Sequence, residues 1–406
     1  MKSNRRVSRG AHRHRVDSER LTHVAEAEGE GLAAGRTSRR TFLGGALAGS
    51  AAIAGSAAIV GAGVVAGGGS SAFAAESSQP TAGDALSFFV IGDTHYLADR
   101  EQPTRIDPRA AEICGKLVDT LNQLPGTEIP ESAGGGRVGQ PRGVIHAGDV
   151  IDTGDKQGGV TGEMQRTEWA AFTRDYGLTG RDGRLKIPVY EVWGNHDSPH
   201  GKGYALDQIA VRNKTRPDVE HVSANGLHYS WNWGPAHFVN LGLIVGGDRT
   251  VARRRRYAAL DSLDFLVADL KDKVGTSGRP VIITHHVDIA RYTGACDLAV
   301  DAGSKEWDPC DVRAFHAALK GYNIAAIFYG HTHARNVFRW DGESPKAETG
   351  IPVFNTDNAS HFSGNAQAFF YVELRDGRLT VREYQTKDRW ATGFFTPQTW
   401  TAPVAT

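Results

Sequence analysis

Five short blocks of polar residues carry the side chains of this sequence that could bind metal ions, and each block follows an apolar run. The blocks are Gly92-Asp93-Thr94-His95, Gly148-Asp149-Val150-Ile151-Asp152, Gly194-Asn195-His196-Asp197, Thr284-His285-His286 and Gly330-His331-Thr332-His333. Carboxylate, amide and imidazole groups suit zinc, manganese and iron alike. Together the blocks supply enough of these groups to hold two metal ions.

The spacing inside the blocks places pairs of these side chains on one side of the chain. Residues i and i+2 of an extended segment point to the same face, so Asp93 can bind an ion together with His95, and the fifth block repeats this spacing. Asp149 and Asp152 are three residues apart after another apolar run. Two carboxylates at a strand end face a cation or cap a helix. Capping explains Asp152 better than it explains Asp149.

The apolar runs before the blocks predict the strands that position them. These strands cover residues 86–91, 142–146, 189–193, 280–284 and 324–329, and further strands are expected at 229–233, 236–243, 351–355, 368–374 and 378–384. Helices are expected at 110–124, 163–176, 257–273 and 311–319, and a long loop at 198–227. Strands that alternate with helices and then give way to a strand-rich end predict an α/β fold of two packed sheets with helices outside.

The charge balance gives no reason to expect stable binding of nucleic acid. The 406 residues include 46 Lys and Arg and 46 Asp and Glu. Residues 1–74 hold ten of the basic and five of the acidic residues, so residues 75–406 carry a net charge of −5. An acidic excess does not attract phosphate backbones or anionic membrane surfaces. A hydrophobic content of 40% allows a substantial core.

The three cysteines do not have the spacing of a zinc finger. Cys114 falls in the predicted helix 110–124 and is expected to be a buried small side chain. Cys296 and Cys310 lie in one loop-like region and can pair in an oxidising compartment. Whether they do depends on the distance between their Cα atoms, which the sequence does not give.

The first 74 residues resemble an export signal. Residues 1–37 are polar and charged, as in disordered segments, and Ser38-Arg39-Arg40-Thr41-Phe42-Leu43 resembles the twin-arginine motif. An uncharged run rich in Gly and Ala covers residues 42–69. Ala72-Phe73-Ala74 then fits the small-x-small cleavage pattern, so Ala75 is the expected first residue of the mature chain.

These features predict a secreted protein with the twin-arginine export machinery as a partner. Residues 75–406 are expected to form a single domain without a membrane anchor. The alternative is that residues 42–69 are retained as an anchor, since the run is long enough to span a membrane.

In their order, the five blocks resemble the motifs of the calcineurin-like metallophosphoesterase superfamily over about residues 86–385. The resemblance implies a four-layered α/β sandwich of two mixed sheets flanked by helices, with the site at the strand ends. The metal ligands that it implies are Asp93, His95 and His333 for a first ion, Asn195, His285 and His331 for a second, and Asp149 as the bridge between them. The ions are manganese, zinc or iron, divalent or mixed-valence, and the sequence does not choose among them.

The resemblance also assigns roles to neighbouring residues. His196 is the histidine that protonates the leaving oxygen or stabilises the transition state, and Asp197 supports it. Of the adjacent histidines in the fourth block, strand alternation favours His285 as the ligand over His286. His361 follows another predicted strand end, and we expect it to be an ordinary loop residue rather than a substrate contact.

The implied activity is hydrolysis of phosphate esters by a hydroxide that the two ions share and that attacks phosphorus. The predicted loop 198–227 and the aromatic side chains Tyr229, Trp231 and Trp233 favour small phosphodiesters of the nucleotide or glycerophosphodiester type. Phosphomonoesters are the alternative substrates. A metal- or phosphate-binding protein on the same fold is the non-enzymatic alternative, which the complete set of ligand positions and His196 disfavours.

Overall fold

The computed structural model describes residues 85–247, 256–297, 299 and 305–405, all within the compact unit Glu76–Thr406. The predicted export signal lies outside the described residues. Among the described residues no helix has the length and apolar character needed to cross a membrane.

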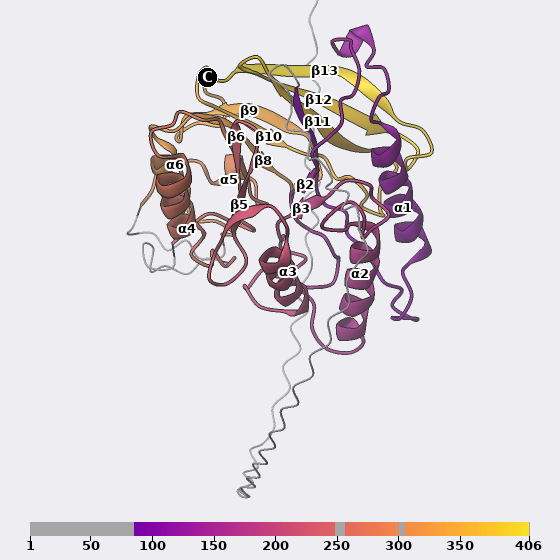
Figure 1. The fold of residues 1–406 in the computed structure, drawn as a ribbon. Helices are drawn as coiled ribbons and strands as arrows, with labels where there is room; N and C mark the ends of the chain where they lie inside the picture. The colour runs from indigo at the N-terminus through magenta and orange to yellow at the C-terminus, as the bar shows by residue number, and fades with distance from the viewer. Residues whose placement is uncertain (1–84, 248–255, 298, 300–304, 406) are drawn as a thin grey trace, which may run out of the picture. The chain divides into compact units, whose positions relative to one another are not determined.

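Two mixed β-sheets form the centre of the fold (Figure 1). The first sheet has the order β13-β12-β11-β1-β2-β3, and the second has the order β4-β5-β6-β7-β8-β10-β9. The strands of the first sheet are β1 (Leu86–Ile91), β2 (Val144–His146), β3 (Val189–Glu191), β11 (Gln367–Arg375), β12 (Arg378–Thr386) and β13 (Phe394–Pro403). Those of the second are β4 (Val219–Val222), β5 (Tyr229–Trp233), β6 (Ala236–Asn240), β7 (Val281–Thr284), β8 (Ile324–Tyr329), β9 (Asn336–Trp340) and β10 (Ile351–Asn355).

Helices flank the sheets, with α1 and α2 on one side and α4 and α6 on the other in Figure 1. Their bounds are α1 (Pro108–Gln123), α2 (Thr161–Asp175), α3 (Tyr204–Thr215), α4 (Ser262–Asp269), α5 (Ile289–Tyr292) and α6 (Pro309–Leu319). A 3₁₀ turn covers Glu131–Ala133, and a π-helical turn, Leu270–Val274, extends α4. The expected sandwich of two mixed sheets flanked by helices is therefore confirmed.

Strand alternation divides the buried side chains between two apolar layers. Phe88 and Val90 of β1 join the cluster between the sheets, whereas Phe89 and Ile91 join the cluster beneath the helices. Both faces of the central strands are thus covered, as is typical of parallel strands in α/β proteins. β1, β2 and β3 pair in parallel, as do β6, β7, β8 and β10, so the carboxyl ends within each run point the same way.

The structure corrects several of the predicted elements. The segment 198–227 contains α3 and β4 rather than a continuous loop, because Ala205, Leu206 and Ile209 bury one face of a short helix. β9 and β13 were not predicted. β13 is a mostly polar edge strand, and its apolar alternation is therefore weak. The helix expected from residue 257 begins at Ser262.

Two of the three cysteines are paired in the structure, and the third is free. Cys114 is buried, as predicted. Cys296 and Cys310 form a disulfide. The bond joins the segment after α5 to the first turn of α6. The carboxylate of Glu306, just before α6, contacts the site described below.

Candidate metal centre

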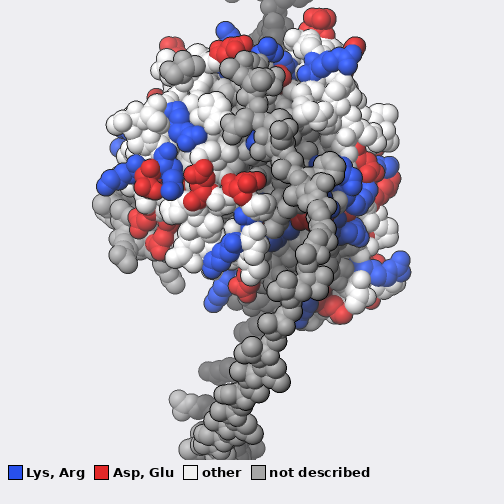
Figure 2. All heavy atoms as spheres, in the orientation of Figure 1, with Lys and Arg blue, Asp and Glu red and all other residues white. Residues whose placement is uncertain are grey.

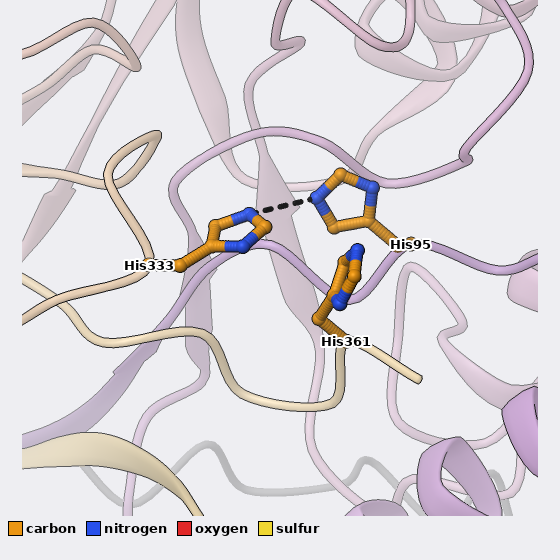
Figure 3. Close-up of side chains that lie close together, drawn as sticks. All are labelled: His95, His333 and His361. Atoms are coloured by element: carbon orange, nitrogen blue, oxygen red, sulfur yellow. Dashed lines mark hydrogen bonds between the residues drawn. The ribbon is translucent and has the colours of Figure 1, made fainter. Parts of the chain in front are cut away.

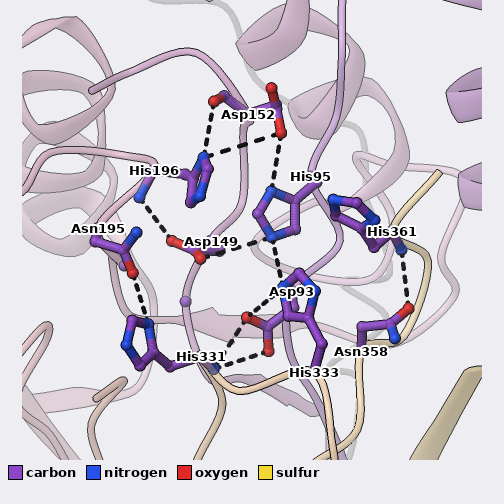
Figure 4. A network of polar contacts seen from close by, with 12 residues as sticks. Asp93, His95, Asp149, Asp152, Asn195, His196, His331, His333, Asn358 and His361 are labelled. Carbon is purple, nitrogen blue, oxygen red and sulfur yellow. Dashed lines mark hydrogen bonds and ion pairs between the residues drawn. The ribbon is translucent and has the colours of Figure 1, made fainter. Parts of the chain in front are cut away.

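The polar blocks meet at the carboxyl ends of parallel strands from both sheets (Figure 4). The strands and the side chains that follow them are β1 with Asp93 and His95, β2 with Asp149, β3 with Asn195 and His196, β7 with His286, and β8 with His331 and His333. Ligands of open parallel sheets bind at this end of the strands. Residues more than 230 positions apart are therefore brought within hydrogen-bonding distance.

A first group of four side chains can hold one ion. The ligand atoms of Asp93, His95, Asp149 and His333 all lie within 4.8 Å of one another. Nε2 of His95 is 3.1 Å from Nε2 of His333 and 3.6 Å from Oδ2 of Asp149. Nε2 of His333 is 3.4 Å from Oδ1 of Asp93. Two imidazole nitrogens and two carboxylates that converge in this way suit a common divalent cation.

A second group shares one of these carboxylates. Asp149, His286 and His331 also offer ligand atoms within 4.8 Å of one another. The amide oxygen of Asn195 lies 3.2 Å from Nε2 of His286 and 2.8 Å from Nδ1 of His331. Because Asp149 belongs to both groups, its carboxylate connects them.

The second nitrogen of three rings is held by an oxygen acceptor outside the groups. Nδ1 of His95 lies 3.1 Å from a carboxylate oxygen of Asp152, and Nδ1 of His286 lies 2.7 Å from the carbonyl oxygen of Ala147. Nε2 of His331 is 3.2 Å from the carboxylate of Glu306. When one nitrogen donates its proton outward, the lone pair of the other faces the ion. Asp152 therefore orients His95.

The backbone at these residues is unusual. Asp93, His95, Asp149, His331 and His333 have positive φ angles of 56°, 44°, 52°, 78° and 51°. Non-glycine residues rarely adopt this conformation, and they cluster at functional sites where the surrounding structure enforces it.

A glycine allows two of the blocks to approach closely. A β-carbon at Gly194 would collide with Asp149 and would lie 2.7 Å from Nε2 of His286. Glycine is the residue that permits such close approach of backbone to a neighbouring group. The Gly before Asn195 is therefore required by packing of the third block against the second.

The choice between the two adjacent histidines was wrong, because the structure places His286 and not His285 in the second group. His285 stacks on Tyr329 with a centroid distance of 5.6 Å and contacts Phe315 of α6 edge-on. Ile283, two residues earlier, is also buried beneath the helices. Alternation therefore continues through His285 on the helix-facing side and turns His286 toward the site.

Replacement of these two histidines tests the correction. We expect His286→Leu to bind less metal than the wild-type protein, because it removes a ligand nitrogen 3.2 Å from both Asp149 and Asn195. His285→Leu keeps an apolar side chain in an aromatic environment and should retain the wild-type metal content. Metal content per chain, measured on purified variants, distinguishes them. Loss of an ion from His285→Leu but not from His286→Leu would restore the original assignment.

His196 stands at the edge of both groups. Its Nδ1 lies 3.0 Å from the carbonyl oxygen of Asp152, and its ring packs edge-on to His95 at 4.7 Å between centroids. The side chain is 31% exposed, so a substrate can reach it. Burial disfavours the protonated ring, but the charges of Asp149 and Asp152 outweigh burial and raise the pKa of His196. The ring is thus placed to donate a proton.

Asp197 does not act through His196 as predicted. Its buried carboxylate accepts hydrogen bonds from the backbone N–H groups of Gly194, Val150 and Ile151, at 2.7, 3.1 and 2.9 Å. Burial and the nearby charge of Asp149 raise the pKa of Asp197 to about 7. The side chain therefore links the third block to the second.

The aromatic side chains of the β5–β6 hairpin are part of the core rather than of the site. Tyr229, Trp231 and Trp233 are buried between the sheets, and Trp231 stacks on Tyr190 with a centroid distance of 4.4 Å. They cannot hold a substituent of the substrate. Arg212 of α3, which lies in the segment expected to be a long loop, forms an ion pair with Glu191.

Two residues at the site were discounted or missed. His361 packs edge-on to His95 with a distance of 4.6 Å between the ring centroids, and its ring centroid lies 4.8 Å from that of His333 (Figure 3). In the sequence, the feature that could have placed His361 at the site is its position after the predicted strand 351–355. Glu306 lies in no motif, and only the fold brings it to His331.

The donor set fits divalent cations. Asp93 and Asp149 are almost fully buried, and buried carboxylates require opposite charge or hydrogen-bond donors. Burial opposes their ionisation, but His333 beside Asp93 and His286 beside Asp149 outweigh it and lower both pKa values. Ionised carboxylates and neutral imidazoles are the forms that bind zinc, manganese or iron.

Residues 86–335 match the family model described as calcineurin-like phosphoesterase, which covers more than half of the sequence. The chain belongs to this family. It is a metal-dependent phosphoric ester hydrolase.

Solved structures with a similar fold have low sequence identity. A dimetal phosphatase from Danio rerio is 13% identical over 79% of this chain and 100% of its own, with a TM-score of 0.48. The structure of PhoD is 12% identical over 78% of this chain and 73% of its own, with a TM-score of 0.44. Vps29 from Entamoeba histolytica, complexed with zinc, is 14% identical over 78% and 99%, with a TM-score of 0.27. No curated protein matches the sequence.

Proposed function

We propose that the chain hydrolyses small phosphate esters with two divalent metal ions. The observation that carries this proposal is the membership of Asp149 in both groups of ligand atoms. Asp93, His95 and His333 would hold the first ion together with Asp149. Asn195, His286 and His331 would hold the second ion together with the same carboxylate. When bound, such a pair of ions supplies Lewis acidity to the phosphate and lowers the pKa of a water molecule.

The side chains of this protein have separate parts in the reaction. Asn195 is neutral, so it binds an ion without reducing the positive charge that attracts a phosphate. His196 donates Nδ1–H to the carbonyl of Asp152, which leaves Nε2–H of the protonated ring for the leaving oxygen. As the bond from phosphorus to that oxygen breaks, the oxygen takes the proton from His196. The carboxylate of Asp152 accepts a hydrogen bond from Nδ1 of His95, and its carbonyl oxygen accepts one from Nδ1 of His196. Asp152 therefore positions both the metal ligand and the proton donor.

We propose small esters rather than polymeric nucleic acid as substrates. Among the described residues visible in Figure 2, basic and acidic side chains are interspersed, whereas a phosphate backbone is attracted by a continuous basic area. The aromatic hairpin gives no preference for diesters over monoesters, because its rings are in the core.

The test compares bis-p-nitrophenyl phosphate with p-nitrophenyl phosphate in the presence of manganese or zinc. We expect metal-dependent hydrolysis of at least one compound, with a loss of about 100-fold or more in Asn195→Ala, because the second ion loses a ligand. Faster cleavage of the first compound identifies a phosphodiesterase, and faster cleavage of the second a phosphatase. Absence of metal-dependent hydrolysis of both would favour the binding-protein alternative.

We further propose that the protein is exported by the twin-arginine pathway and released from the membrane. The motif around Arg39 and Arg40 and the cleavage pattern before Ala75 support export. The disulfide between Cys296 and Cys310 is consistent with an oxidising compartment. N-terminal sequencing of protein recovered from the medium should give Ala75. A chain that keeps residues 42–69 and remains with the membrane fraction would contradict release.

A further inference from the structure

A carboxylate outside the sequence motifs faces the second group of ligands. Oε2 of Glu306 lies 3.2 Å from Nε2 of His331, while Nδ1 of the same ring lies 2.8 Å from the amide oxygen of Asn195. The side chains of Glu306 and His331 are only 17% and 9% exposed. A carboxylate that accepts the outer ring proton fixes the tautomer and the orientation of a metal-binding histidine. Glu306 therefore determines which nitrogen of His331 is offered to the ion.

Two tyrosines fix the carboxylate of Glu306 itself. The hydroxyl of Tyr257 donates to Oε1 at 3.1 Å, and the hydroxyl of Tyr292 donates to Oε2 at 2.7 Å. Both oxygens are thus occupied, and the carboxylate cannot rotate without breaking a hydrogen bond. The three side chains come from different segments, so their arrangement depends on how those segments are held together.

The disulfide holds two of these segments together. Tyr292 is the last residue of α5 and lies four residues before Cys296, and Glu306 lies four residues before Cys310 at the start of α6. The Cys296–Cys310 bond therefore links the chain just beyond each of the two hydrogen-bonded residues. A cross-link between such segments restricts their separation and reduces the entropic cost of their contact.

We propose that Glu306 is a positioning residue for His331 and that the Cys296–Cys310 disulfide keeps Glu306 in place, so that the second metal ion binds tightly to the disulfide-bonded protein. This inference rests on the proposed pair of ions. It assigns a functional consequence to a disulfide that lies outside all five motifs. It also makes the two ions unequal, because Glu306 contacts His331, which belongs to the second group only.

The test is a calorimetric titration of metal-free protein with manganese or zinc. We expect wild-type protein to bind two ions, and Glu306→Gln to bind the first with unchanged affinity and the second 10- to 100-fold more weakly. Glu343→Gln is the matched control, because Glu343 is 77% exposed and pairs with Arg313 rather than with a proposed ligand, and it should leave both ions unchanged. Tyr292→Phe removes one hydrogen bond to Glu306 and should weaken the second ion by a smaller factor.

The contribution of the disulfide is measured in the Cys296→Ser/Cys310→Ser variant. Cys114 is then the one cysteine left in the sequence, so no disulfide can form within the chain. We expect the second ion to bind more weakly, and Glu306→Gln to cost less in this variant than in the wild-type protein. Such a dependence of one change on the other is the sign of a shared interaction.

Three outcomes overturn the inference and separate it from the proposed function. Equal affinity for the second ion in wild-type protein and Glu306→Gln overturns the inference alone, even if the disulfide variant fails to fold. Equal weakening of both ions in Glu306→Gln also overturns it, because that result indicates a general structural role. Binding of only one ion to the wild-type protein overturns the proposed function together with the inference.

Discussion

Asp149→Asn should lose about 10³-fold in kcat/KM and should no longer retain two metal ions. Oδ2 of Asp149 lies 3.2 Å from Nε2 of His286 and 3.6 Å from Nε2 of His95, between the two groups of ligands. Asparagine keeps the shape of the side chain but removes the charge that both ions share. Loss of one ion from a two-ion site removes several kcal/mol of transition-state stabilisation, and about 4 kcal/mol corresponds to 10³-fold.

Asp119→Asn is the control for this change. Asp119 is 55% exposed and pairs with Arg184, so the same substitution there should leave activity and metal content unchanged. Activity is measured on the faster p-nitrophenyl ester and metal content by elemental analysis of the same sample. An Asp149→Asn enzyme that keeps both ions and has a kcat/KM within tenfold of the wild-type value would show that the carboxylate does not bridge the two ions.

Glu191→Gln should reduce the free energy of unfolding by about 3 to 5 kcal/mol. Glu191 at the end of β3 is fully buried and lies 2.8 Å from Nη2 of Arg216 and 2.7 Å from Nε of Arg212. Arg216 is itself buried, so the substitution leaves a guanidinium without its counter-charge. The loss arises from the unpaired cation rather than from the net strength of the ion pair.

Glu128→Gln is the matched control, since Glu128 is 80% exposed in its pair with Arg137. Its free energy of unfolding should stay within about 0.5 kcal/mol of wild type. Both variants are compared by urea unfolding at neutral pH with metal-free protein, which separates the effect from metal binding. A Glu191→Gln protein as stable as the control would indicate that the two arginines find other partners.

The buried carboxylate of Glu191 also predicts how the free energy of unfolding depends on pH. Burial opposes ionisation of Glu191, but the charges of Arg212 and Arg216 outweigh it and lower the pKa of Glu191 from 4.5 to about 2. Because the pKa of Glu191 is lower in the folded than in the unfolded state, its contribution to the free energy of unfolding is fully present above pH 4.5 and is lost as the pH falls toward 2. The difference between wild type and Glu191→Gln should therefore shrink over this range. A constant difference from pH 7 to pH 2 would contradict the assignment.

The strands and most of the site could be predicted because their signals are local. An apolar run followed by Asp-x-His or His-x-His specifies both a strand and the face on which its polar end lies. For this reason β1 and β8 deliver the expected side chains. The same rule, applied with the buried Ile283 as the reference, would have identified His286 instead of His285.

The remaining features depend on contacts between distant segments. α3 has a short apolar face of Ala205, Leu206 and Ile209, too few positions to show a clear period. Glu306 has no sequence signal at all, because its role follows from the approach of α5, α6 and β8. The burial of the aromatic hairpin could not be read from alternation, since the same pattern describes a strand with one face exposed.

The central claim, that Asp149 joins two metal ions in one phosphoesterase site, is tested most directly by metal content together with activity. Wild-type protein prepared with excess manganese or zinc and freed of unbound metal should contain two ions per chain. Removal of the ions with a chelator should abolish hydrolysis of the p-nitrophenyl esters, and their return should restore it. A fully active protein with one ion per chain, or one that stays active without metal, would contradict the account.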